Sequence, residues 1–257
     1  MTALLAVACA VLGLLVGSLA KVVVRRVPAG DPLRPVRRPC PSCAAEPGAI
    51  EVVPVVSWLV RRGRCRACGE RIGWRDPLIE IGCAALFAAA AVRFGWAWEL
   101  PAYLALFGGL VVLSAIDLEH FLLPNRVLYP TLFTVAPLLA LASVLDGTAT
   151  SALHAAEGGL AAFAVFFLIN FAYPEGMAFG DVRLAGVLGM ATGWLGIGHV
   201  LLTFFLAFLT SSAIGLTLIF LGVRGRRDPI PFGPFLALGA VLTVFFGQPI
   251  LDVYLRR

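Results

Sequence analysis

The chain has 257 residues, of which 60% are hydrophobic and 14% charged, and its mean hydropathy is +0.93. This balance excludes an ordinary soluble domain and predicts an all-α polytopic membrane protein. The net charge of +5 would be compatible with nucleic-acid binding in a soluble protein. Here the basic residues fall in loops between apolar segments, so we expect no nucleic-acid partner.

Eight segments each supply the roughly 20 mostly apolar residues that a membrane-spanning helix needs. They are residues 3–23, 78–97, 99–116, 127–145, 152–173, 182–198, 200–222 and 232–254. The sixth and eighth are the weakest, being Gly-rich or interrupted by polar residues. Arginines crowd the loop after the first segment and recur at 224–227, so the positive-inside rule places both loops in the cytoplasm and both termini outside.

Residues 25–77 form a polar segment that is too long for an ordinary connection, which predicts a small cytoplasmic domain. It contains two CxxC pairs with 21 residues between them: Cys40, Cys43, Cys65 and Cys68. This spacing is typical of a structural zinc site; a redox dithiol and unused thiols are the alternatives. Cys9 and Cys83 lie inside predicted spans and are expected to be small apolar core residues. The predicted domains are therefore a first helix (1–24), a tetracysteine zinc-binding domain (25–77) and a membrane core (78–257).

Two acids lie at the ends of apolar segments, Asp117 after the third and Asp181 before the sixth. An ionised carboxylate at the edge of hydrocarbon is costly, and the count of spans puts both on the cytoplasmic face. We therefore predict that they form a catalytic pair. The alternative is that each only marks a helix end, Asp181 as an N-cap.

Three further charged residues lie near the same face. Glu80 is expected either to pair with an arginine such as Arg75 or to face a site. Lys21 is expected to extend its ammonium group to the membrane interface. His120 is expected to be a bystander to the aspartates.

Together these features resemble the type IV prepilin peptidases, membrane aspartic proteases with a GxGD-type motif, and the resemblance covers nearly the whole chain. The matching motifs are Gly17-Ser18, the two CxxC pairs, Pro54-Val-Val-Ser-Trp58-Leu, Arg62-Gly-Arg-Cys65-Arg-Ala-Cys68-Gly, Asp117 with Leu123-Pro124, Gly180-Asp181-Val, and Pro231-Phe-Gly-Pro234-Phe.

The resemblance implies a bifunctional enzyme of the bacterial inner membrane. Such enzymes cleave a basic leader from prepilins or pseudopilins of type IV pili and type II secretion, and then methylate the new N-terminus with S-adenosylmethionine. On this basis Asp117 and Asp181 are the catalytic dyad of an aspartic peptidase core at 78–257, and the zinc loop supports substrate handling or methyl transfer.

The sequence departs from the family pattern at five positions: Ala178 replaces the first glycine of GxGD, Arg183 a lysine, Lys21 an asparagine, Asn125 an aspartate and Asp76 a tyrosine. Alanine would be disfavoured at 178 if that residue needs a positive φ.

A basic leader needs acidic partners, and Glu80, Glu119 and Glu175 are predicted to supply them, because all three are expected on the cytoplasmic face. Three other readings remain: a peptidase without methyltransferase activity, a membrane transporter that couples to protons or cations, and a zinc-stabilised scaffold without catalysis.

Overall fold

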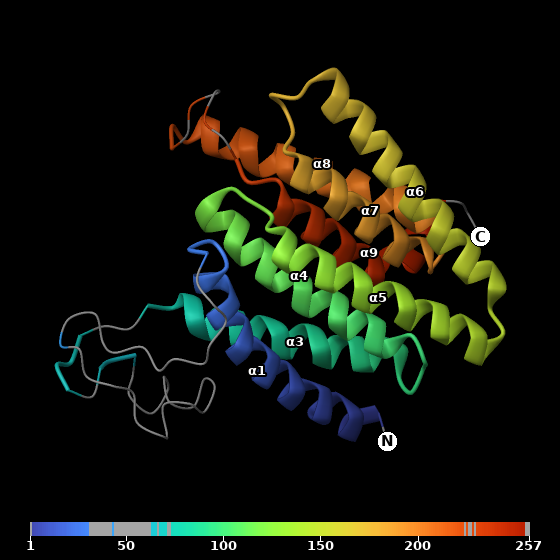
Figure 1. The fold of residues 1–257 in the computed structure, drawn as a ribbon, viewed down its shortest axis with the longest axis horizontal. Coiled ribbons are helices and arrows are strands. Elements are labelled where there is room, and N and C mark those ends of the chain that lie inside the picture. The colour runs from blue at the N-terminus through green and yellow to red at the C-terminus, as the bar shows by residue number, and fades with distance from the viewer. Residues whose placement is uncertain are drawn as a thin grey trace. The chain divides into compact units, whose positions relative to one another are not determined.

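The computed structural model describes residues 2–30, 43, 63–65, 67–70, 73–223, 225, 228 and 230–254. Within these residues the regular structure consists of eight α-helices (Figure 1). They are α1 (Thr2–Arg26), α3 (Arg75–Phe94), α4 (Leu100–His120), α5 (Asn125–Asp146), α6 (Ala149–Ala172), α7 (Phe179–Gly193), α8 (Ile197–Phe220) and α9 (Gly233–Tyr254). The predicted all-α fold is confirmed.

Seven of these helices are long and apolar enough to cross a membrane, and the protein is a multi-pass membrane protein. The exception in the described part of the chain is α7, with 15 residues. At 1.5 Å per residue it is about 22 Å long, shorter than the roughly 30 Å hydrocarbon core of a bilayer. The sixth predicted span, 182–198, is therefore not one continuous helix, because the chain leaves α7 at Gly193 and begins α8 at Ile197.

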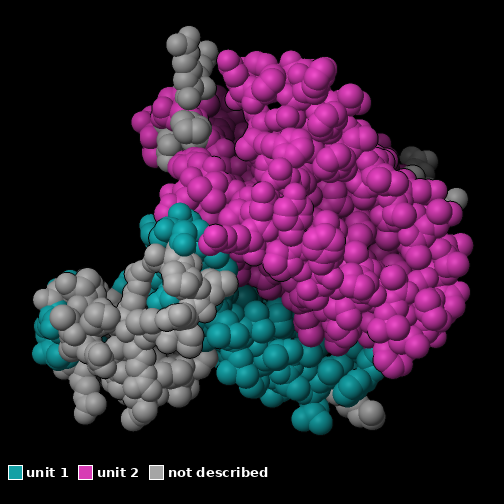
Figure 2. All heavy atoms as spheres, in the orientation of Figure 1, with its two compact units in different colours: residues 1–96 teal, residues 97–257 magenta. Residues whose placement is uncertain are grey.

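The chain divides into two compact units, residues 1–96 and residues 97–257, which are coloured separately in Figure 2. In the first unit α1 packs against α3 at very short range. A Cβ atom added to Gly13 would lie 2.7 Å from the Ala84 Cα atom, and one added to Gly17 would lie 2.6 Å from that of Glu80. These glycines let two helix backbones touch, as small residues do in membrane helix pairs.

Ion pairs join the same two helices. The Lys21 ammonium group pairs with Glu80, whose side chain is only 2% exposed, and Arg25 pairs with Asp76. Glu80 thus pairs with a lysine of α1, and the Lys21 side chain, which is 23% exposed, reaches this buried carboxylate. Cys9 and Cys83 are buried, as expected.

The second unit is built around α4 and α7. Helix α4 carries six of the twelve largest fully buried side chains of the described residues, and it packs against α5 and α9. Ten of the 15 residues of α7 are buried, and α7 packs mainly against α6. The two helices that carry the predicted catalytic acids are therefore the core of this unit.

Glycines explain how α7 fits beside α6. A Cβ atom on Gly189 would lie 2.4 Å from the carbonyl oxygen of Gly158, and one on Gly193 would lie 2.4 Å from that of His154. Gly186 faces Phe163, so the contacts move toward the start of α6 as the chain advances along α7. The two helices therefore run antiparallel. The glycines that weaken the sixth window as a hydropathy signal are thus packing residues.

Candidate active site

Asp117 lies in the last turn of α4 and is 5% exposed. Its Oδ2 atom accepts a hydrogen bond of 2.9 Å from the backbone N–H of Gly233, the first residue of α9. The helix ends because Phe121 adopts a left-handed conformation (φ 54°) and its N–H donates to the Asp117 carbonyl oxygen. A bulky residue rarely adopts this conformation, so the turn directly after Asp117 holds some backbone strain.

Asp181 lies in the first turn of α7 and is 7% exposed. Its backbone N–H donates to the carbonyl oxygen of Ala178, which occupies the N-cap position. Asp181 is therefore not the N-cap, and the alternative role given to it above is wrong. Ala178 has φ −72° and ψ 144°, extended backbone that any residue adopts, so alanine fits where the family motif has glycine.

Leu123 links the two acidic helix ends. A Cβ atom on Gly180 would lie 2.9 Å from Cβ of Leu123, and one on Gly233 would lie 3.0 Å from its Cδ2 atom and 2.8 Å from Oδ2 of Asp117. Gly180 therefore makes room for the side chain of Leu123. Because Leu123 lies against both Gly180, next to Asp181, and Gly233, next to Asp117, the two acids lie at adjoining helix ends.

The structure thus brings the two predicted acids together from α4 and α7, with the start of α9 as a third wall. The role of the Gly233 N–H group was not predicted from the sequence. Gly233 does lie in one of the quoted motifs, Pro231–Phe235. The motif itself does not indicate that its backbone donates a hydrogen bond to a carboxylate 116 residues earlier.

A second cluster of chemically active side chains lies in the first unit. The Sγ atoms of Cys43, Cys65 and Cys68 all lie within 4.8 Å of one another, and those of Cys43 and Cys65 are 3.9 Å apart. The Gly69 N–H donates to the Cys65 carbonyl oxygen, with Gly69 at φ 72°, so the second CxxC forms a tight turn. This cluster could hold a metal ion; the fourth predicted ligand, Cys40, lies outside the described residues.

Comparison with known proteins agrees with these features. Residues 11–94 match the bacterial peptidase A24 N-terminal domain, and residues 104–220 match the type IV leader peptidase family. A protein of Stutzerimonas stutzeri is 34% identical, with 97% of this chain and 94% of the relative aligned, and one of Bacillus subtilis is 32% identical, with 96% of each aligned. A third, of Pseudomonas aeruginosa, is 34% identical over 95% of this chain and 91% of its own. The chain belongs to the type IV leader peptidase family.

All three relatives are named prepilin leader peptidase/N-methyltransferase. No solved structure matches the chain. The match to the leader peptidase family begins inside α4 and ends with α8, so it includes both Asp117 and Asp181. The match to the N-terminal domain includes the cysteine cluster and the ion pairs of α1 and α3.

The three acids predicted to bind a leader are in different surroundings. Glu119 and Glu175 are exposed; Glu119 lies two residues after Asp117, and Glu175 lies in the loop before α7. His120 is 3.9 Å from the Glu119 carboxylate and is itself exposed. Glu80 is buried against Lys21 in the first unit. None of these placements tests binding, and all three assignments stay predictions.

Proposed function

We propose that this protein is a membrane aspartic endopeptidase that removes the leader peptide from type IV prepilin-like substrates and then methylates the new N-terminus. The observation that carries the proposal is the meeting of two buried acids, Asp117 and Asp181, at adjoining helix ends in a member of the leader peptidase family. The named relatives support both activities.

Two neighbouring carboxyl groups cannot both ionise easily, so they share one proton. The carboxylate of the pair takes a proton from water, and the water oxygen bonds to the scissile carbonyl carbon. The other acid gives its proton to the carbonyl oxygen, and the tetrahedral intermediate then breaks its C–N bond as the leaving amine is protonated. The proton belongs to Asp117 and Asp181 jointly. In this scheme the Gly233 N–H fixes the orientation of the Asp117 carboxyl group.

We further propose that the site faces the cytoplasm in the bacterial inner membrane, because the arginine-rich loop after α1 follows the positive-inside rule and α3 and α4 return the chain to the same side. A prepilin carries its basic leader in the cytoplasm and its apolar helix in the membrane. The exposed carboxylates of Glu119 and Glu175 would attract the leader. Replacing both with lysine should raise KM for a leader peptide; unchanged kinetics would contradict this role.

The thiols fit a structural zinc ion. Tetrahedral Zn–S bonds of about 2.3 Å separate the sulfur atoms by about 3.8 Å. The 3.9 Å between the Cys43 and Cys65 sulfur atoms agrees with that value. Cys43, Cys65 and Cys68 would be three ligands and Cys40 the fourth. Zinc would hold this short polar segment folded. S-adenosylmethionine, implied by the methyltransferase name of the relatives, would be the methyl donor.

The decisive experiment co-expresses the protein with a candidate prepilin and measures leader cleavage by gel mobility. Asp117→Asn and Asp181→Asn should each abolish cleavage at unchanged membrane insertion, whereas Asp146→Asn, an exposed acid at the end of α5, should cleave normally. Near-normal cleavage by either of the first two variants would refute the dyad. Incubation of the purified enzyme with labelled methyl donor and cleaved substrate tests the second activity, and cleavage without labelling would leave a peptidase only.

The transporter and scaffold readings gain no support. Asp117 and Asp181 lie in the terminal turns of their helices, whereas a proton or cation relay needs acids near the middle of the bilayer.

A further inference from the structure

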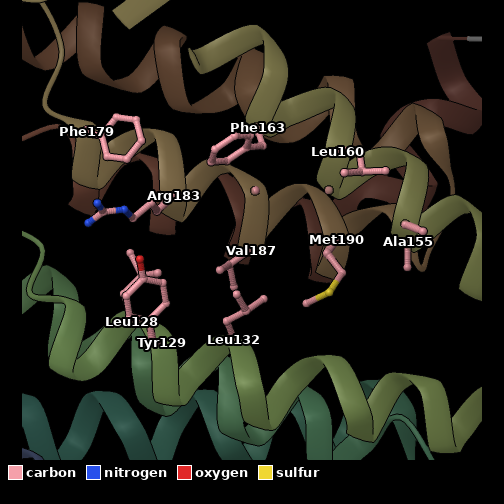
Figure 3. A pocket seen from close by; sticks show the side chains of 13 residues that line it. Leu128, Tyr129, Leu132, Ala155, Leu160, Phe163, Phe179, Arg183, Val187 and Met190 are labelled. Atoms are coloured by element: carbon pink, nitrogen blue, oxygen red, sulfur yellow. The ribbon is translucent and has the colours of Figure 1, made fainter.

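A groove lies between α5, α6 and α7 in the second unit, with a volume of about 480 Å³. It is within the usual size range of ligand pockets, roughly 300–1,000 Å³. The side chains that line it are almost all apolar: Leu128, Tyr129, Leu132, Ala155, Ala156, Gly159, Leu160, Phe163, Phe179, Arg183, Gly186, Val187 and Met190. Figure 3 shows Phe179 and Arg183 at one end and Ala155 and Met190 at the other. Leu160 is 72% exposed, so the groove is open on its outer side.

This groove is separate from the pair of aspartates. Helix α7 contributes Phe179, Arg183, Val187 and Met190 to it, residues spaced three or four apart on one face. Asp181 is two residues from Arg183, which rotates it about 200° around the helix. It is not among the lining residues. A ligand in the groove would therefore contact the opposite face of the helix that carries Asp181.

Arg183 is the only charged residue among the described residues that line the groove. Its guanidinium carbon lies 4.5 Å from the ring centre of Phe179 and 5.8 Å from that of Tyr129, and one of its N–H groups donates to Asn125 Oδ1. A guanidinium has five N–H donors, so donors remain for a ligand. The two rings and the amide hold the cation at the mouth of an apolar groove.

We propose that this groove binds one acyl chain of an anionic phospholipid, with the lipid phosphate on the Arg183 guanidinium. Charge and polarity carry the assignment: a cation at one end and an apolar channel along the rest match an amphiphile with an anionic head. Basic pockets between membrane helices bind such headgroups, and the guanidinium fork pairs two donors with phosphate oxygens. A basic leader would be repelled by Arg183, and an apolar substrate helix would leave the cation without a counter-ion.

The test uses the full-length protein, purified in detergent and stripped of lipid. Phosphatidylglycerol should raise its thermal midpoint and remain bound in native mass spectrometry, whereas phosphatidylcholine and glycerol phosphate should do neither. In Arg183→Gln the apparent Kd for phosphatidylglycerol should rise about tenfold or more, because a charge-assisted hydrogen bond is lost. Ala156→Phe, which fills the groove, should abolish binding.

Two matched controls keep the result specific. Arg126→Gln removes an exposed arginine at the same end of α5, and Ala161→Phe adds a ring to an exposed position of α6; neither residue lines the groove. Both should bind phosphatidylglycerol like the wild type. Equal stabilisation by phosphatidylcholine and phosphatidylglycerol would overturn the proposal. So would phosphatidylglycerol binding that survives both Arg183→Gln and Ala156→Phe, or Arg183-dependent protection by a prepilin peptide in place of the lipid.

Discussion

Gly233→Ala tests whether the start of α9 positions the Asp117 carboxyl group. Gly233 does not have a positive φ, so alanine costs nothing in backbone conformation and any effect is steric. The new Cβ atom would lie 2.8 Å from Oδ2 and 3.3 Å from Cγ of Asp117, and 3.0 Å from Cδ2 of Leu123. Contacts this short force the carboxyl group to move, and the hydrogen bond from the Gly233 N–H is lost with it.

Overpacking of this kind costs about 1–3 kcal/mol of stability. A displacement of a catalytic group by about 1 Å lowers kcat by roughly 100-fold. The assay is leader cleavage at equal amounts of folded enzyme, with the thermal midpoint measured in parallel. Gly82→Ala is the matched control, because no atom lies within 4 Å of its added Cβ and helical alanine should be neutral or stabilising.

Adding Leu123→Ala to Gly233→Ala removes one of the two clashes and leaves the one with Asp117 Oδ2. We expect this double variant to regain stability without regaining activity. The reasoning is refuted if Gly233→Ala cleaves at the wild-type rate, or if the double variant restores cleavage along with stability.

Three further predictions concern the rest of the fold. Cys65→Ser should lower the metal content from about one zinc ion per chain to almost none, measured by elemental analysis, while Cys9→Ala leaves it unchanged; equal zinc in both would contradict the assigned site. Lys21→Met should destabilise the protein by up to about 3 kcal/mol, because Glu80 stays buried without its lysine, and adding Glu80→Leu should recover most of the loss in thermal midpoint. Tyr103→Phe removes the hydrogen bond of 2.9 Å that the phenol donates to the Ala191 carbonyl oxygen and should cost about 1 kcal/mol; an unchanged thermal midpoint would show that this bond is not stabilising.

Local sequence signals predicted much of the candidate site. The two acids stand out because each ends an apolar segment, and the CxxC pairs because their spacing is regular. Whether alanine is tolerated at position 178 depends on the backbone angle φ. Only the fold shows that φ is −72° there, a value that alanine adopts freely. The strained turn at Phe121 has no local signal, because a bulky residue is an unusual choice for left-handed backbone.

Pairings between distant residues could not be predicted in the same way. Lys21 is 59 residues from Glu80, and their pairing follows from the close approach of α1 and α3 at Gly13 and Gly17. The sixth apolar window was read as a span of 182–198, but α7 is shorter, because its glycines serve packing against α6 and the chain turns after Gly193. Hydropathy measures only composition within a window, so it cannot distinguish a membrane-spanning helix from a shorter helix whose glycines serve packing.

The sequence by itself determined that this protein is a helical membrane protein, because the thickness of the bilayer requires apolar segments of a certain length. Apolar composition and segment length are both local properties of the sequence. The cysteine spacing also predicted a metal site, and the acids at the ends of apolar segments predicted a catalytic pair. Only the tertiary structure decided that the N–H of Gly233 holds Asp117, that Leu123 lies between Gly180 and Gly233, and that Arg183 faces a groove away from Asp181. Each of these depends on which helix faces pack together, and packing joins residues far apart in the chain.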